Sequence, residues 1–176
     1  MWRKLYSLIQ NYFELFNLPE KFQLDLEMLQ ENYRAIQKKI HPDRFATSSE
    51  NEKVQSMIKS TQINDAYQTL KSPIKRAKYI LSLHKSIEKI TLPPDFLMQQ
   101  MEWEEHLEDI EDIEDIEKNN SELAQFKLTI NKKYEEYFLL ISTQIDHDQN
   151  WIDAAISIDK LYFIEKLLQK INNALN

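Results

Sequence analysis

The fold of this chain is decided by the stretch Y-R-A-I-Q-K-K-I-H-P-D-R-F, residues 33–45. It closes an amphipathic run in which apolar residues recur at steps of three and four, the spacing of one helix face. These residues are Leu26, Leu29, Tyr33, Ile36 and Ile40. Pro42 has no N–H and disfavours helical backbone at the residue before it, so the helix is predicted to end near Ile40. A charged loop at the end of a helix indicates a docking site.

The tripeptide His41-Pro42-Asp43 in this setting resembles the signature of a J-domain. A basic amphipathic helix precedes it, and a second amphipathic helix that contains residues 63–70, I-N-D-A-Y-Q-T-L, follows. The resemblance implies an antiparallel helical hairpin that docks on a DnaK-type chaperone and stimulates its ATPase. The residues expected to contact the chaperone are His41, Pro42, Asp43, Arg34, Lys38, Lys39 and Arg44.

Two other interpretations of this stretch are open. Acidic residues early in the helix and basic residues late in it also suit the helix dipole, although Arg44 lies beyond the helix end. As an acid–base pair, His41 and Asp43 have no accompanying nucleophile or oxyanion donor. The protein is therefore expected not to be an enzyme.

Composition excludes several classes of function. The 176 residues include no glycine, so no glycine-rich phosphate loop can form, and Asn is expected to be its main substitute at left-handed helix caps. The chain also lacks cysteine, and His84, His106 and His147 are isolated, so no metal site and no cofactor are expected. No apolar run reaches membrane-spanning length, residues 1–10 are not expected to be a secretory signal, and we expect no membrane partner.

The periodicity predicts an all-α protein. Helices are expected over 11–17, 26–40, about 47–70 and 74–84, with Val54, Ile58, Ala66 and Leu70 facing inward. Beyond the corner at residues 92–94, helices are expected over 95–118, 121–145 and 150–175. Short connections make the last three an antiparallel bundle. The predicted domains are a J-domain with a following short helix (1–88, core 11–71) and a three-helix bundle (89–176).

Charge divides at the same place. Residues 1–90 hold 15 Lys and Arg against 10 Asp and Glu, a net charge of +5, whereas residues 91–176 hold 7 against 19, a net charge of −12. Two oppositely charged halves indicate two different protein partners. Nucleic acid is a poor candidate, because the basic half lacks a dense stripe of Lys and Arg and the acidic half repels phosphates.

The predicted helix 95–118 carries two apolar facets. Phe96, Trp103, Leu107 and Ile110 form a stripe sufficient for the bundle core, and the repeated Asp-Ile-Glu triplets of residues 109–117 are expected to be a solvated helix face. The second facet holds Leu97, Met98 and Met101 beside acidic residues. It either packs on the J-like domain or forms an exposed protein-binding surface.

Several segments together resemble the HscB family, J-domain co-chaperones of iron–sulfur cluster assembly. They are residues 12–19 (YFELFNLP), 41–46 (HPDRFA), 76–84 (RAKYILSLH), 96–102 (FLMQQME), 153–155 (DAA) and 160–163 (KLYF). The resemblance implies that the J-domain engages the chaperone HscA, or DnaK where HscA is absent, and that the bundle binds the scaffold protein IscU. The scaffold-binding residues it implies are Leu97, Met98, Met101, Glu102, Glu105, Asp109 and Phe163.

Two of these residues, Met101 and Asp109, depart from the more usual Leu and Glu. The cysteine-bearing N-terminal module of some eukaryotic members is absent, which favours a bacterial, cytoplasmic protein; a eukaryotic one is expected in the mitochondrial matrix. The expected function is that of an adaptor that delivers IscU and activates a partner's ATPase. The alternatives are a general J-domain co-chaperone with a different client and a non-chaperone helical interaction protein.

Overall fold

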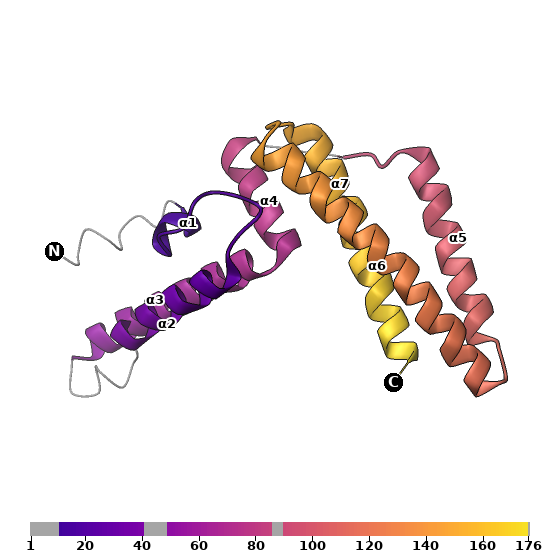
Figure 1. Ribbon diagram of the computed structural model, residues 1–176. Coiled ribbons are helices and arrows are strands. Elements are labelled where there is room, and N and C mark those ends of the chain that lie inside the picture. Colours follow the sequence, from indigo (N-terminus) through magenta and orange to yellow (C-terminus); the bar gives the residue numbers. More distant parts are fainter. Residues whose placement is uncertain (1–10, 41–48, 86–89, 176) are drawn as a thin grey trace. The chain divides into compact units, whose positions relative to one another are not determined.

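The computed structural model describes residues 11–40, 49–85 and 90–175, and these residues form seven helices and no strand (Figure 1). The predicted all-α fold is confirmed for this part of the chain. It divides into two compact units, Met1–Ile80 and Leu81–Asn176. The boundary lies within one helix, α4.

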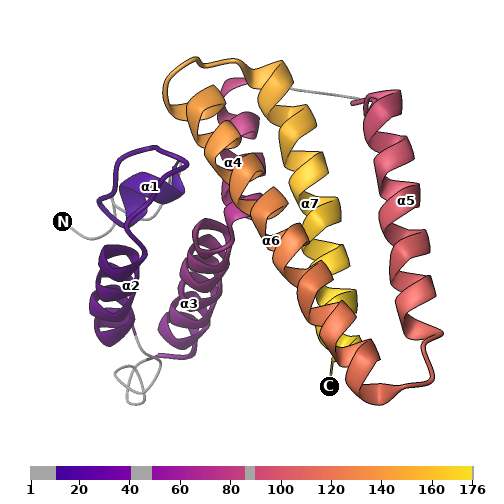
Figure 2. The same ribbon diagram turned by 45° about the vertical axis from the view of Figure 1, so that its right-hand side comes forward.

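The first unit is built on a helical hairpin. A short helix α1 (Tyr12–Leu15) precedes α2 (Leu26–Ile40) and α3 (Glu50–Lys71), which lie side by side in Figures 1 and 2. The bounds of α2 match the prediction, and Asp25 caps it by accepting hydrogen bonds from the backbone N–H groups of Glu27 and Met28, each at 3.0 Å.

The caps follow the expectations for a chain without glycine. Asn17 adopts the left-handed conformation after α1 (φ 51°), where the N–H of Leu18 reaches back to the carbonyl of Phe13 at 2.9 Å. Gln149, which precedes α7, is the other described residue with positive φ (53°). The substitution of Asn for glycine was thus predicted correctly at one position, and Gln takes the second.

The inward face of α3 differs from the prediction in its first half. Ala66 and Leu70 are fully buried, but Val54 and Ile58 are exposed, with 52% and 46% of their surfaces accessible. Ser56 takes the inward position in this half of the helix and is buried. Its hydrogen bond to the end of α2 replaces an apolar contact, which apolar periodicity could not reveal.

A buried arginine holds the corner between α3 and α4 (Pro73–His84). The Nη1 atom of Arg76 donates a hydrogen bond to the carbonyl of Leu70 at 2.6 Å, and its guanidinium lies over the ring of Phe22, 5.2 Å from the centroid. A cation at the carbonyl end of a helix is favoured by the helix dipole. This contact joins the end of the hairpin to α4.

The second unit is an antiparallel three-helix bundle. Helices α5 (Pro94–Glu111), α6 (Ile116–Asp146) and α7 (Trp151–Ala174) run side by side in Figures 1 and 2. The last turn of α4 also belongs to this unit, and the ring of His84 stacks on Trp151 with 4.4 Å between centroids. The buried core residues are Phe96, Trp103, Leu107, Ile110, Leu123, Phe126, Ile130, Ile164, Leu167 and Ile171.

The triplets of residues 109–117 are not one solvated helix face, so this prediction is wrong. Helix α5 ends at Glu111, and α6 begins at Ile116, several residues before the predicted position. Asp115 caps α6 by accepting a hydrogen bond from the N–H of Lys118 at 2.9 Å, and the side chain of Asn119 donates to the carbonyl of Ile110 at 2.7 Å. These side chains satisfy free backbone groups at the turn, which therefore needs neither glycine nor proline.

Candidate protein-docking sites

Helix α2 presents the basic residues predicted for chaperone contact. Arg34, Lys38 and Lys39 are all exposed, while Leu29 and Ile40 are buried. At 100° per residue, Arg34 and Lys38 lie opposite the buried side, and Lys39 lies on its flank. The other predicted contact residues, residues 41–44, lie outside the described residues. The structure thus shows that the three predicted basic residues of α2 are exposed on that helix.

Aromatic and amide contacts hold this helix in position. The rings of Tyr33 and Tyr67 stack with 4.1 Å between centroids, which joins α2 to α3. The Tyr33 hydroxyl donates a hydrogen bond to Asn64 Oδ1 at 3.3 Å and accepts one from Gln37 Nε2 at 3.2 Å. Asn32 Nδ2 donates to the carbonyl of Phe16 at 2.8 Å. The exposed basic side chains therefore stand on a helix with fixed neighbours.

The carboxyl end of α2 is tied to α3 by one hydrogen bond. The hydroxyl of Ser56 donates to the carbonyl of Ile40 at 2.9 Å, and both residues are buried. The last carbonyls of a helix have no partner within the helix, so a side-chain donor at this position stabilises the helix end. The contact fixes the residue that directly precedes His41 in the sequence.

Helix α1 is held against α4 by a tyrosine pair. The rings of Tyr12 and Tyr79 stack with 4.3 Å between centroids, and the backbone N–H of Tyr12 donates to the Tyr79 hydroxyl at 2.9 Å. Burial raises the pKa of Tyr79, although the hydrogen bond from Tyr12 acts in the opposite direction. The hydroxyl is thus neutral near pH 7 and accepts this hydrogen bond without carrying a charge.

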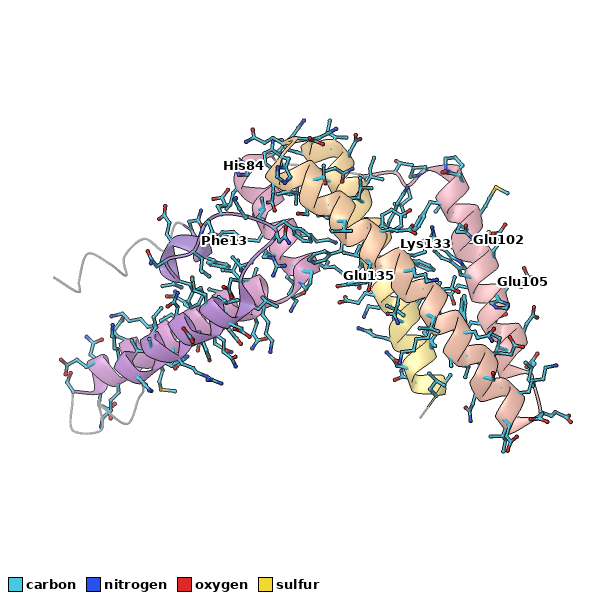
Figure 3. The ribbon with its side chains drawn as sticks, viewed as in Figure 1. Phe13, His84, Glu102, Glu105, Lys133 and Glu135 are labelled. Carbon is cyan, nitrogen blue, oxygen red and sulfur yellow. The ribbon has the colours of Figure 1, made fainter. Side chains whose placement is uncertain are left out.

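The second candidate site is the outer face of α5, which we call the α5 patch. All six of its residues are exposed; they are Leu97, Met98, Met101, Glu102, Glu105 and Asp109. The exposed fractions of the three apolar side chains are 44%, 64% and 72% in that order. The six residues share one side of the helix at 100° per residue, with the apolar ones toward its amino end and the carboxylates toward its carboxyl end. Figure 3 shows Glu102 and Glu105 on the side of α5 away from α6.

The opposite face of the same helix is buried. Phe96, Trp103, Leu107 and Ile110 all belong to the bundle core. Phe96 makes edge-to-face contacts with Trp103, at 6.2 Å between centroids, and with Tyr137 of α6, at 6.1 Å. The inner face of α5 thus supplies the apolar surface that the bundle needs, and the apolar residues of the patch are surplus to it.

Phe163 of α7 contacts rings on the inner face of α5. It is half-buried and stacks on Trp103 with 6.3 Å between centroids, and it makes an edge-to-face contact with Phe96 at 6.1 Å. Both of these rings lie on the inner face of α5. Within the described structure, Phe163 supports the helix that carries the patch.

The carboxylates of α5 have different surroundings. Gln99 Nε2 donates to Glu102 Oε2 at 2.8 Å, along the helix surface. Glu104 pairs with Lys170 of α7 and so fastens α5 to the bundle. Glu108 is exposed and, one heptad after Met101, shares its side of the helix. Glu108 was not among the predicted site residues, although helical periodicity from Met101 places it on the same side.

This arrangement suits docking of a protein. An exposed apolar cluster beside acidic groups fits a partner surface with an apolar centre and basic residues around it. Within the described ranges, no three His, Asp or Glu side chains are placed to hold a metal ion together. None of the described helices is both long and apolar enough to span a membrane.

Two family models match the chain. The DnaJ domain matches residues 11–79, and the HSCB C-terminal oligomerisation domain matches residues 92–172. Curated relatives include the co-chaperone protein HscB homologues of Vibrio vulnificus (strain CMCP6), 42% identical over 165 residues, and of Aliivibrio fischeri (strain MJ11), 44% identical over 166 residues. In each case the match covers 92% of this chain and 94% of the relative.

Solved structures of HscB and Jac1 co-chaperones are similar to this one. The chaperone HscB from Vibrio cholerae has a TM-score of 0.84 at 41% identity, with 93% of this chain and 96% of that chain covered. The human co-chaperone protein HscB also has a TM-score of 0.84, at 28% identity, with 95% and 83% covered. The Jac1 co-chaperone from Saccharomyces cerevisiae shares the fold, with a TM-score of 0.69 at 16% identity and 92% of both chains covered. With relatives above 40% identity over almost its whole length, the chain belongs to the HscB family of J-domain co-chaperones.

Proposed function

We propose that this protein is an adaptor of iron–sulfur cluster assembly that delivers the scaffold protein IscU to a DnaK- or HscA-type chaperone and stimulates the chaperone's ATPase. Membership of the HscB family and the DnaJ-domain match over residues 11–79 support this role. The adaptor has no chemistry of its own, and cluster transfer takes place on its partners.

The J-domain contributes the contact with the chaperone. Arg34, Lys38 and Lys39 offer positive charge on an α2 that is fixed to its neighbours. His41, Pro42, Asp43 and Arg44 follow this helix directly and complete the proposed contact. Basic side chains at the edge of a contact steer association and fix its orientation. In this proposal, the His41-Pro42-Asp43 sequence triggers ATP hydrolysis.

The α5 patch, with Phe163 beside its helix, contributes the contact with the scaffold. The observation that carries this part is the exposure of Leu97, Met98 and Met101 on a helix whose inner face already fills the bundle core. Three exposed apolar side chains within two helical turns cost solubility unless a partner covers them. Glu102, Glu105 and Asp109 provide the charged rim.

A chain that carries both the chaperone contact and the scaffold contact can bring its two partners together. Binding the scaffold through one unit and the chaperone through the other raises the effective concentration of the scaffold at the chaperone. We assign chaperone activation to residues 1–88 and scaffold binding to residues 89–176. The curated relatives named above are bacterial, which supports a place of action in the bacterial cytoplasm.

Two measurements test this proposal. Calorimetric titration with purified IscU is expected to show binding, and a steady-state assay of a DnaK-class chaperone is expected to show faster ATP hydrolysis when this protein is added. Stimulation of the chaperone's ATPase without IscU binding would favour the alternative of a general J-domain co-chaperone with a different client. Absence of both effects would leave a helical interaction protein and overturn the proposal.

A further inference from the structure

We propose that Met98 and Met101 are a paired oxidation site that controls scaffold docking. In this inference, peroxide converts the two thioethers to sulfoxides, and the modified α5 patch releases the scaffold. The inference rests on the proposed function, because it concerns the same surface. It adds a modification, its chemical agent and its effect.

The sulfur atoms of this chain have an unusual distribution. The sequence has five methionines and no cysteine, so a thioether is the only form of sulfur that an oxidant can meet. Four of the methionines are described, and all four are exposed, with accessible fractions of 47% for Met28, 60% for Met57, 64% for Met98 and 72% for Met101. Methionine usually fills gaps in a core, whereas here it lies at the surface. Every described thioether is therefore open to a dissolved oxidant.

Position separates Met98 and Met101 from the other two methionines. They are three residues apart on α5, so their side chains are neighbours on the helix surface. Leu97 lies beside them, and Glu102 and Glu105 lie on the same outer face. Both sulfur atoms thus sit within the apolar part of the α5 patch.

The chemistry is balanced with peroxide alone. A sulfur lone pair attacks one peroxide oxygen, an S–O bond forms as the O–O bond breaks, and hydroxide departs. The hydroxyl group now on sulfur loses its proton to this hydroxide, which gives the sulfoxide and one water. The sulfur is oxidised by two electrons and the peroxide is reduced by two. Methionine sulfoxide reductases reverse this modification, so the site can act as a switch.

A sulfoxide changes the patch without changing the fold. The S=O group is polar and must lose its bound water when an apolar partner surface covers it, which is costly at the centre of an interface. The bundle core lies on the opposite face of α5 and contains neither residue. Oxidation is therefore expected to weaken docking by roughly tenfold or more while the melting temperature stays unchanged.

The experiment compares three proteins before and after mild hydrogen peroxide treatment. They are the wild type, the double variant Met98→Leu/Met101→Leu and the matched control Met28→Leu/Met57→Leu. Leucine keeps the volume and apolar character of methionine and cannot be oxidised in this way. Trypsin separates the sites, because Met28 lies in residues 22–34, Met57 in residues 54–59, and Met98 and Met101 in residues 90–118. Mass spectrometry of these peptides gives the extent of oxidation, and calorimetry with purified IscU gives affinity.

Before treatment, the wild type and the matched control are expected to bind IscU with similar affinity, and the effect of treatment on each protein is measured against that protein's own untreated affinity. Failure of the untreated wild type to bind would overturn the proposed function and this inference together. After treatment, the wild type and the matched control are expected to lose affinity, the Met98→Leu/Met101→Leu variant is expected to keep it, and sulfoxide reductase is expected to restore it in the first two. The inference alone is overturned if the treated wild type keeps its affinity, whether or not Met98 and Met101 are oxidised. It is also overturned if the leucine variant of the patch loses as much affinity as the wild type.

Discussion

The two faces of α5 hold similar numbers of large apolar side chains and serve different ends. On the inner face, Phe96, Trp103, Leu107 and Ile110 are buried in the bundle core. On the outer face, Leu97, Met98 and Met101 are exposed and lie beside carboxylates. A three-helix bundle needs one apolar face per helix, so the second face does not contribute to the fold of the unit. One helix can thus carry the fold and a docking surface at the same time.

The largest effect on stability is expected from the inner face. Trp103→Ala removes a buried indole that stacks on Phe163 and contacts Phe96, so the free energy of unfolding should fall by about 3–5 kcal/mol. The matched outer-face change, Met101→Ala, should alter it by less than about 0.5 kcal/mol. Urea unfolding followed by circular dichroism measures both. Equal losses for the two variants would remove the distinction between the faces.

The outer face should reverse this pattern when binding is measured. Replacing Leu97, Met98 and Met101 together with Ala should leave the melting temperature nearly unchanged and weaken IscU binding by roughly several kcal/mol, because a few central apolar anchors dominate most interfaces. Calorimetry and a thermal melt of the same preparation provide the two quantities. If the three side chains were packed in the interior, each truncation would cost about 2–5 kcal/mol of stability. A large loss of stability with unchanged affinity for IscU would show that these residues pack in the core and are not part of the binding site.

A smaller effect is expected from the carboxylates of the patch. Glu102→Gln/Glu105→Gln should lower the association rate with IscU several-fold at low salt and flatten its salt dependence, because charges at an interface rim act mainly on encounter. The dissociation rate should change little. Glu117→Gln/Glu135→Gln, two exposed acids on α6, is the matched control (Figure 3 labels Glu135). Stopped-flow mixing at several salt concentrations measures the association rates of both double variants. If the two variants slowed association equally, the net charge of the unit, and not the position of the patch carboxylates, would set the rate.

The sequence predicted the fold where a pattern had one physical cause. Proline at position 42 and the apolar repeat before it correctly gave the end of α2 at Ile40. The lack of glycine correctly indicated Asn at a left-handed cap, and Asn17 occupies one. Prediction failed where polar side chains replaced the expected signal, at the inward Ser56 of α3 and at the turn capped by Asp115.

The candidate sites were predictable to different degrees. Helical periodicity separated the two facets of α5, and the structure supplied the exposure that periodicity cannot give for Leu97, Met98 and Met101. Phe163 came only from the family resemblance, and its contacts with inner-face rings required coordinates. Hydrogen bonds between residues far apart in sequence, such as that from Ser56 to Ile40, leave no local signal in the chain.

In the proposed function, this protein activates a chaperone through its J-domain while its bundle holds the scaffold. The most direct test is the ATPase rate of a DnaK-class chaperone with the wild type, with His41→Gln and with the triple alanine variant of the patch, each with and without IscU. The wild type should stimulate hydrolysis, and IscU should increase the stimulation. His41→Gln should abolish stimulation yet retain its fold by circular dichroism and its affinity for IscU, whereas the triple variant should lose only the increase due to IscU. Stimulation by His41→Gln at the wild-type level would show that His41 does not activate the chaperone and would overturn the J-domain role.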